Sequence, residues 1–99
     1  MATRHIIDLI TSDEKVRNGQ PCIAGTGVRV MDIALAKIAH GQDADGIAEW
    51  YDLTLPQVYA GLAYYYQHKA ETDETIRQNM KEARELKAKN GGKRHPLLP

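Results

Sequence analysis

The potentially reactive side chains of this sequence are one cysteine and a few scattered histidines, and glycines cluster around the cysteine. Cys22 is the only thiol of the 99-residue chain, and the histidines are His5, His40, His68 and His95. A reactive thiol needs a base or a cation beside it, and a zinc site needs ligands paired at short spacings. No histidine stands at such a spacing. The sequence therefore predicts a structural Cys22, no metal site, no cofactor and no enzymatic activity.

The glycine cluster lies in residues 18–33, "NGQPCIAGTGVRVMDI". Gly25 and Gly27 are one residue apart, but no third glycine follows at the spacing of a dinucleotide-binding loop, and the chain has no Gly-Lys-Ser/Thr. Such features hold the phosphate in the known loops. The glycines instead permit positive φ, which suits a tight reversal between "QPCI" and "VRV".

Composition predicts one soluble domain. Apolar residues make up 42% of the chain and charged residues 26%. No apolar run approaches the ~20 residues that cross a bilayer, and no signal peptide is visible, so we expect a cytoplasmic protein. The 13 basic and 13 acidic residues cancel. Residues 1–70 hold six basic against eight acidic residues, and residues 71–99 hold seven against five, so the C-terminal segment is slightly basic.

The N-terminal third predicts a short β-hairpin and the rest predicts helices. "HIIDLI", residues 5–10, is rich in β-branched residues, and Asn18-Gly19 marks a turn. The spacing of Met31, Ala34, Leu35 and Ile38 predicts a helix over residues 31–40 that stops at Gly41. Asp43 is a suitable N-cap for a second helix over residues 44–51, with Ile47 and either Trp50 or Tyr51 facing inward.

A capping box marks the start of a third helix at "TLPQ". Thr54 is the cap, Pro56 lies in the first turn and Gln57 follows three residues after Thr54. The pattern predicts two faces on this helix. The core face holds Leu55, Val58, Leu62 and Tyr65, and a flat face of small and polar residues holds Gln57, Ala60, Gly61, Tyr64 and His68. The short connection between the second and third helices is typical of a helix-turn-helix.

A fourth helix is predicted over residues 71–89, with a thin apolar stripe and a stop at Asn90-Gly91-Gly92. The final "KRHPLLP" has two interpretations: a frayed end, or an apolar clip that docks into a partner. The predicted fold class is mainly α: a short N-terminal β-hairpin, a trihelical helix-turn-helix bundle within residues 1–70, and a C-terminal helix and tail in residues 71–99. The predicted partner-binding residues are Ile76, Met80, Ala83, Leu86, Leu97 and Leu98.

The stretch of about residues 10–68 resembles family four-three-three of the domains of unknown function. The matching features are "NGQPCIAGT", the helix start "VMDI", the helix stop "HG" and the cap "DLT". The resemblance implies a β-hairpin followed by a homeodomain-like trihelical bundle. It also implies a VapB-type antitoxin that binds operator DNA as a homodimer and covers a PIN-like ribonuclease toxin with its C-terminal segment.

Two positions depart from the family pattern. The family usually has arginine directly after Gly-Thr, where this chain has Gly27 and places Arg29 two residues later. The family also favours Tyr-Pro before Asp-Leu-Thr, where this chain has Trp50-Tyr51. Arg29 returns to the same face of an extended strand, so its role could persist at the displaced position.

Two functions remain open from the residues themselves. The first is DNA binding, with Gln57 placed to read adenine. The full predicted DNA-binding set is Arg4, Arg17, Arg29, Lys37, Gln57, Tyr64 and His68. The second is a protein-binding or dimerisation module without DNA, because residues 55–68 contain no Lys or Arg and three consecutive tyrosines could form an interface.

Overall fold

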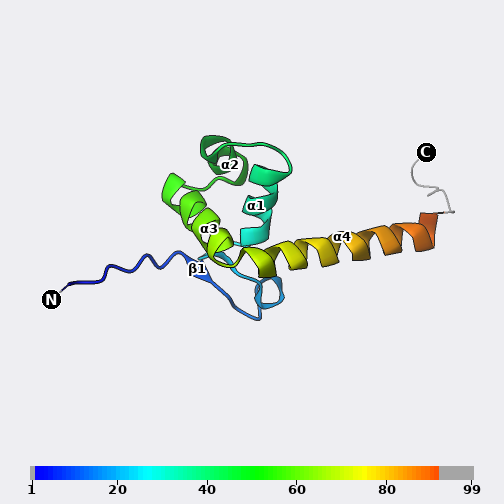
Figure 1. Ribbon diagram of the computed structural model, residues 1–99, viewed down its shortest axis with the longest axis horizontal. Helices are drawn as coiled ribbons and strands as arrows, with labels where there is room; N and C mark the ends of the chain where they lie inside the picture. Colours follow the sequence, from blue (N-terminus) through cyan, green and yellow to red (C-terminus); the bar gives the residue numbers. More distant parts are fainter. Residues whose placement is uncertain (1, 92–99) are drawn as a thin grey trace. The chain divides into compact units, whose positions relative to one another are not determined.

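A computed structural model describes residues 2–91 as a mainly helical chain (Figure 1). Two short strands, β1 (Ile10–Thr11) and β2 (Cys22–Ile23), precede the helices α1 (Val30–Ile38), α2 (Ala44–Tyr51), α3 (Leu55–Gln67) and α4 (Lys69–Gly91). A 3-10 turn, η1 (Arg17–Gly19), lies between the strands. The predicted fold class is therefore confirmed. The chain divides into two units, Met1–Lys69 and Ala70–Pro99, each described by itself below.

The hairpin is much shorter than predicted. Its antiparallel register places Ile10 opposite Ile23 and Thr11 opposite Cys22. The predicted strand over residues 5–10 is wrong except at Ile10, because β2 ends at Ile23 and the chain reverses at Gly25, whose φ is +78°. The turn at Asn18-Gly19 is confirmed, with φ of 58° and 82°.

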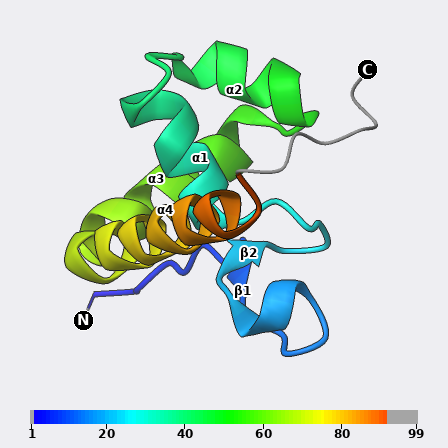
Figure 2. The ribbon, with the colours of Figure 1, turned by 90° about the vertical axis from the view of Figure 1, so that its right-hand side faces the viewer.

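The core of the first unit joins β2 to all three of its helices. Its buried cluster consists of Ile23, Ile33, Ala36, Ile47, Val58 and Leu62. Figures 1 and 2 show the hairpin and α2 at opposite ends of α1 and α3. Helices α1 and α3 cross closely, because a Cβ atom at Gly61 would lie 2.7 Å from Ile33 Cδ1. A side chain at this position of α3 would displace Ile33, so glycine permits the close crossing.

The predicted boundaries of α1 and α2 agree with the structure to within two residues. The chain turns after α1 at Gly41, whose φ is +64°. The Asp43 side chain caps α2 by accepting a 2.8 Å hydrogen bond from Gly46 N. Ile47 is fully buried. Of the two alternatives for the second inward residue, Tyr51 packs against the core, whereas Trp50 is 73% exposed.

Helix α4 begins two residues before the predicted start and extends to Gly91. Its apolar stripe is largely exposed: Ile76 is half-buried, and Met80 and Leu86 are 50% and 61% exposed. Residues 81–89 are exposed on all sides of the helix. The predicted contacts Leu97 and Leu98 lie outside the described residues. In the described part of the chain, no helix is long and apolar enough to cross a membrane.

Candidate functional site

The candidate site is the turn between α2 and α3 together with the outer face of α3. Asp52 ends α2 in the left-handed conformation, with φ 57° and ψ 50°. Leu53 N then donates a 2.8 Å hydrogen bond to the Ala48 carbonyl, which also accepts from Asp52 N in the last turn of α2. Thr54 follows as the N-cap of α3. The chain thus reverses within three residues, and this turn fixes the direction of α3.

The predicted capping box is present, and it uses both the backbone amide and the side-chain carbonyl of Gln57. Gln57 N donates to Thr54 Oγ1 at 3.3 Å, and Thr54 N donates to Gln57 Oε1 at 2.8 Å. The Gln57 side-chain carbonyl is therefore used inside the protein. Reading adenine in the bidentate way needs both the carbonyl and the amide of a glutamine. In this structure only the amide donor of Gln57 is left for a ligand.

Arg29 is committed to an internal ion pair. It is the N-cap of α1, and its Nη2 and Nε donate to the Asp32 carboxylate at 2.8 and 3.1 Å. The Arg29 backbone N donates to the same carboxylate at 2.9 Å, and Nη1 donates to Gln20 Oε1 at 3.4 Å. The hydrogen bond with Asp32 raises the pKa of Arg29 above its ordinary value. Asp32 therefore neutralises this cation, and the hydrogen bond to Gln20 links the start of α1 to the segment before β2.

The spacing of Arg29 and Asp32 is a sequence signal from which this ion pair could have been found. An acidic residue three positions after a helix N-cap is placed as in a capping box, where its side chain accepts from the N-cap backbone. Asp32 makes that hydrogen bond with Arg29 N at the start of α1. Arg29 therefore acts at the start of α1 in this chain, where it is paired with Asp32.

The other predicted DNA-binding residues are dispersed over the first unit. Tyr64 and His68 stack on each other at the end of α3, with ring centroids 4.2 Å apart and an interplanar angle of 25°. Lys37 is exposed on α1, Arg17 is exposed in the η1 turn and Arg4 is exposed in the N-terminal segment. Helix α3 itself contains no Lys or Arg. Phosphate contacts would thus come from elements other than α3.

The outer face of α3 carries an exposed apolar stripe. Leu55, Tyr59 and Tyr66 are 41%, 58% and 53% exposed. The prediction that Leu55 belongs to the core face is wrong. The buried residues of α3 are Val58, Gly61, Leu62 and Tyr65, and this buried side of the helix leaves Leu55 exposed. Gly61, which the pattern assigns to the flat face of small and polar residues, is the point where Ile33 of α1 approaches α3 closely, as a glycine inside a helix permits.

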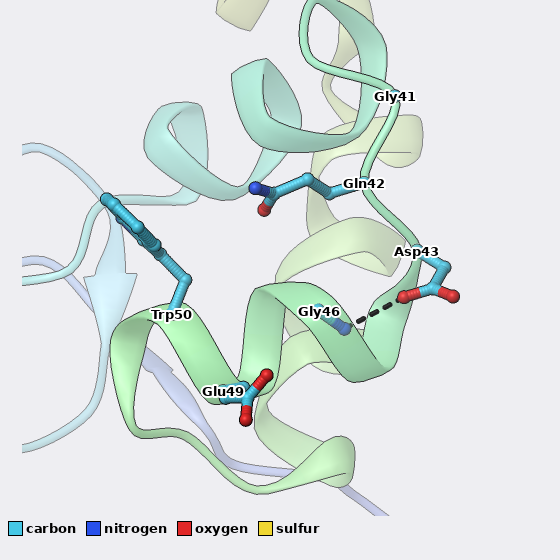
Figure 3. Close-up of a pocket in the computed structure, with 6 residues that line it drawn as sticks. All are labelled: Gly41, Gln42, Asp43, Gly46, Glu49 and Trp50. Carbon is cyan, nitrogen blue, oxygen red and sulfur yellow. Dashed lines mark hydrogen bonds between the residues drawn. The ribbon is translucent and has the colours of Figure 1, made fainter.

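A hollow beside α2 is a feature that the sequence pattern did not indicate (Figure 3). It has a volume of about 590 Å³ and is lined by Gly41, Gln42, Asp43, Gly46, Glu49 and Trp50. In Figure 3 the Gln42 amide points toward the side of the hollow where the Trp50 ring stands. Gln42 Oε1 is buried and has no hydrogen-bond partner among the described residues. The exposed Trp50 indole therefore lines an open hollow, whereas the unpaired Gln42 Oε1 lies below the surface.

The described residues contain no group of three or more side chains that could hold a metal ion. The first unit is a small helical domain whose second and third helices are joined by a three-residue turn. The family model described as "Protein of unknown function (DUF433)" matches residues 10–65. The match spans more than half of the chain, so the chain belongs to this family, as its sequence resemblance predicts. No curated protein and no solved structure matches the chain.

Proposed function

We propose that this protein is the antitoxin of a type II toxin–antitoxin pair in the cytoplasm. Its C-terminal segment would neutralise a PIN-like ribonuclease toxin, and its first unit would bind operator DNA as a homodimer. The observation that carries the proposal is α4, a 23-residue helix with an exposed apolar stripe.

Helix α4 has the properties of a segment that is completed by a partner. A single helix in water is marginally stable, and burial of an apolar face is what normally stabilises it. Met80 and Leu86 present such a face, and both are at least half exposed. A groove on a partner protein that accepts residues spaced three and four apart would cover this stripe. The slight excess of basic residues in positions 71–99 favours an acidic surface on that partner.

The neutralisation test uses the full chain co-expressed with the product of the adjacent reading frame. In Met80→Asp an acidic group replaces the centre of the stripe, and in Gln78→Asp the same group is placed on the opposite, polar face of α4. We expect the wild type and Q78D to form a complex and restore growth, and M80D to lose both. Equal behaviour of M80D and Q78D, or no complex with the wild type, would contradict the proposal.

DNA binding rests on the turn between α2 and α3 and on the Gln57 amide. Gln57→Glu is the sharpest variant, because a glutamate preserves the capping box while it removes the only free donor of Gln57. We expect Q57E to unfold at the same temperature as the wild type but to lose its preference between operator sequences. Binding is measured by fluorescence anisotropy over a range of salt concentrations, since phosphate contacts make affinity fall with salt.

Lys37→Gln is the control for contacts that carry no sequence information. A lysine that touches a phosphate contributes affinity to every sequence, so K37Q should weaken binding uniformly and reduce the salt slope by about one. The absence of any DNA binding by the wild type at low salt would rule out this part of the proposal and leave neutralisation untouched.

A protein-binding module without DNA is the second candidate. It is favoured by the exposed Leu55, Tyr59 and Tyr66 on a helix that carries no cation. Tyrosine suits protein interfaces because a large apolar ring ends in a polar hydroxyl. If this candidate holds, Tyr59→Asp should abolish binding of the partner while the wild type shows no affinity for DNA. Partner binding by Y59D equal to that of the wild type would exclude it.

A further inference from the structure

We propose that residues 4–8, "RHIID", pair with the same segment of a second copy as antiparallel β-strands, so that two hairpins form one four-stranded sheet. This inference deepens the homodimer invoked in the proposed function and rests on it. Its test needs neither DNA nor toxin, so the failure of one is distinguishable from the failure of the other.

The first observation is that residues 4–8 form an extended segment with no pairing strand in the described part of this chain. Ile6 and Ile7 are 81% and 78% exposed, the highest values among the large hydrophobic residues that the structure describes. Figure 1 shows the segment before β1 as an extended trace (dark blue) leading away from α1, α2 and α3. If the register of Ile10 with Ile23 continued, residues 4–8 would face residues 25–29. Those residues instead reverse at Gly25 and return to pair Arg29 with Cys22.

The second observation is the open backbone of this segment. In the described part of the chain, the last backbone contact at this end of the sheet is the hydrogen bond from Ala24 N to the Leu9 carbonyl. The amides and carbonyls of residues 4–8 are therefore open to another strand. An extended, β-branched segment with unpaired backbone groups is a template for strand addition.

The charges of residues 4–8 favour a second copy of the same segment as the strand that pairs with it. When two such segments run antiparallel with Ile6 opposite Ile6, Arg4 lies opposite Asp8, and the same pair recurs across the two-fold axis. Opposite charges placed directly across two strands are stabilising, and like charges are destabilising. A parallel arrangement would place Arg4 against Arg4 and Asp8 against Asp8. A shift by two residues in one direction would place Asp8 against Ile6 and Arg4 against Ile10, and a shift in the other direction would place Arg4 against Ile6. Both shifts lose the two opposite-charge pairs, so the charges favour one register.

Cysteine cross-linking tests the register in the full chain. In this pairing, Ile6→Cys brings two Cα atoms to about 4.5–5.5 Å, within the range of a disulfide. His5→Cys is the matched control, because its two copies lie diagonally at about 7–8 Å. We expect I6C to form a covalent dimer under mild oxidation at least about tenfold faster than H5C. The wild type, whose only thiol is the buried Cys22, reports the background.

A charge swap tests the pairing by an independent measurement. Arg4→Asp and Asp8→Arg each place like charges together twice in the dimer, and each should raise the dissociation constant of the dimer about twofold to thirtyfold. The double variant R4D/D8R restores opposite charges and should return to the wild-type value. Sedimentation velocity over a range of concentrations measures these constants. Both positions are exposed and lie outside the core, so the fold is retained.

Three results would overturn the inference: equal cross-linking of I6C and H5C, no recovery in the double variant, or a wild type that remains monomeric at every concentration. In the last case the open edge would be available to a strand of a different protein, and the self-complementary charges would have no part in it.

Discussion

The three-helix bundle and α4 are both helical, yet they are stabilised in different ways. In the bundle, Ile33, Ile47 and Val58 are fully buried, and each of the three helices contributes to one core. Helix α4 is longer than any of them, but residues 81–89 are all exposed. Helix length therefore does not indicate stability, because tertiary burial contributes more than intrinsic helix propensity.

The two regions should differ most in their response to truncation of an apolar side chain. Ile47→Ala removes a fully buried side chain from the bundle and should lower the free energy of unfolding by about 2–5 kcal/mol. Leu86→Ala in α4 is the matched control and should change it by less than about 0.5 kcal/mol, because Leu86 is 61% exposed. Urea denaturation followed by circular dichroism gives both values. Similar losses would mean that α4 has a buried face of its own.

A more modest effect tests the close crossing of α1 and α3. Gly61→Ala places a methyl group 2.7 Å from Ile33 Cδ1, and Ile33→Val removes that atom. The added Cβ atom would then meet Ile23 Cδ1 at 3.5 Å, an ordinary contact. We expect the double variant to be more stable than the sum of the two single changes by about 0.5–2 kcal/mol in a double-mutant cycle. Additive effects would show that the crossing has room for a side chain.

The weakest of these effects is a loss of stability in alkali that is confined to the bundle. Burial raises the pKa of the Cys22 thiol, and burial followed by the charge of Asp32 raises the pKa of Tyr51. The folded state keeps these protons at a pH where the unfolded chain releases them. Stability is therefore fully present below the ordinary pKa of each group and is lost as the pH rises above it.

Each proton contributes at most about 1.4 kcal/mol per pH unit to this slope. Cys22→Ala should make the fall in the free energy of unfolding between about pH 8 and pH 10 shallower. Helix α4 contains neither Cys nor Tyr, so its helical signal should not follow this slope. A slope unchanged by C22A would show that the thiol does not contribute.

Elements with local signals could be predicted from the sequence. The Asp43 cap of α2, the Thr54–Gln57 box of α3 and the turn at Asn18-Gly19 each depend on a few neighbouring residues. The family was also readable, because its motifs are short and fixed in spacing. The candidate site was only partly predictable. The capping box at Gln57 and the turn before it were located, but the box uses the Gln57 carbonyl that the predicted bidentate contact with adenine would also need.

Which side chains remain available to a ligand depends on tertiary packing, and no local pattern predicts it. Ile33 reaches Gly61 from another helix and buries it, although the pattern of α3 alone does not identify this neighbour. Tyr51 rather than Trp50 packs against the core, although the sequence pattern allowed either residue to face inward. Helical periodicity gives the direction in which a side chain points around the axis of its helix, but it does not give the place where a neighbouring helix crosses. That crossing is set by the volumes of side chains far apart in the sequence, and it decides what is buried.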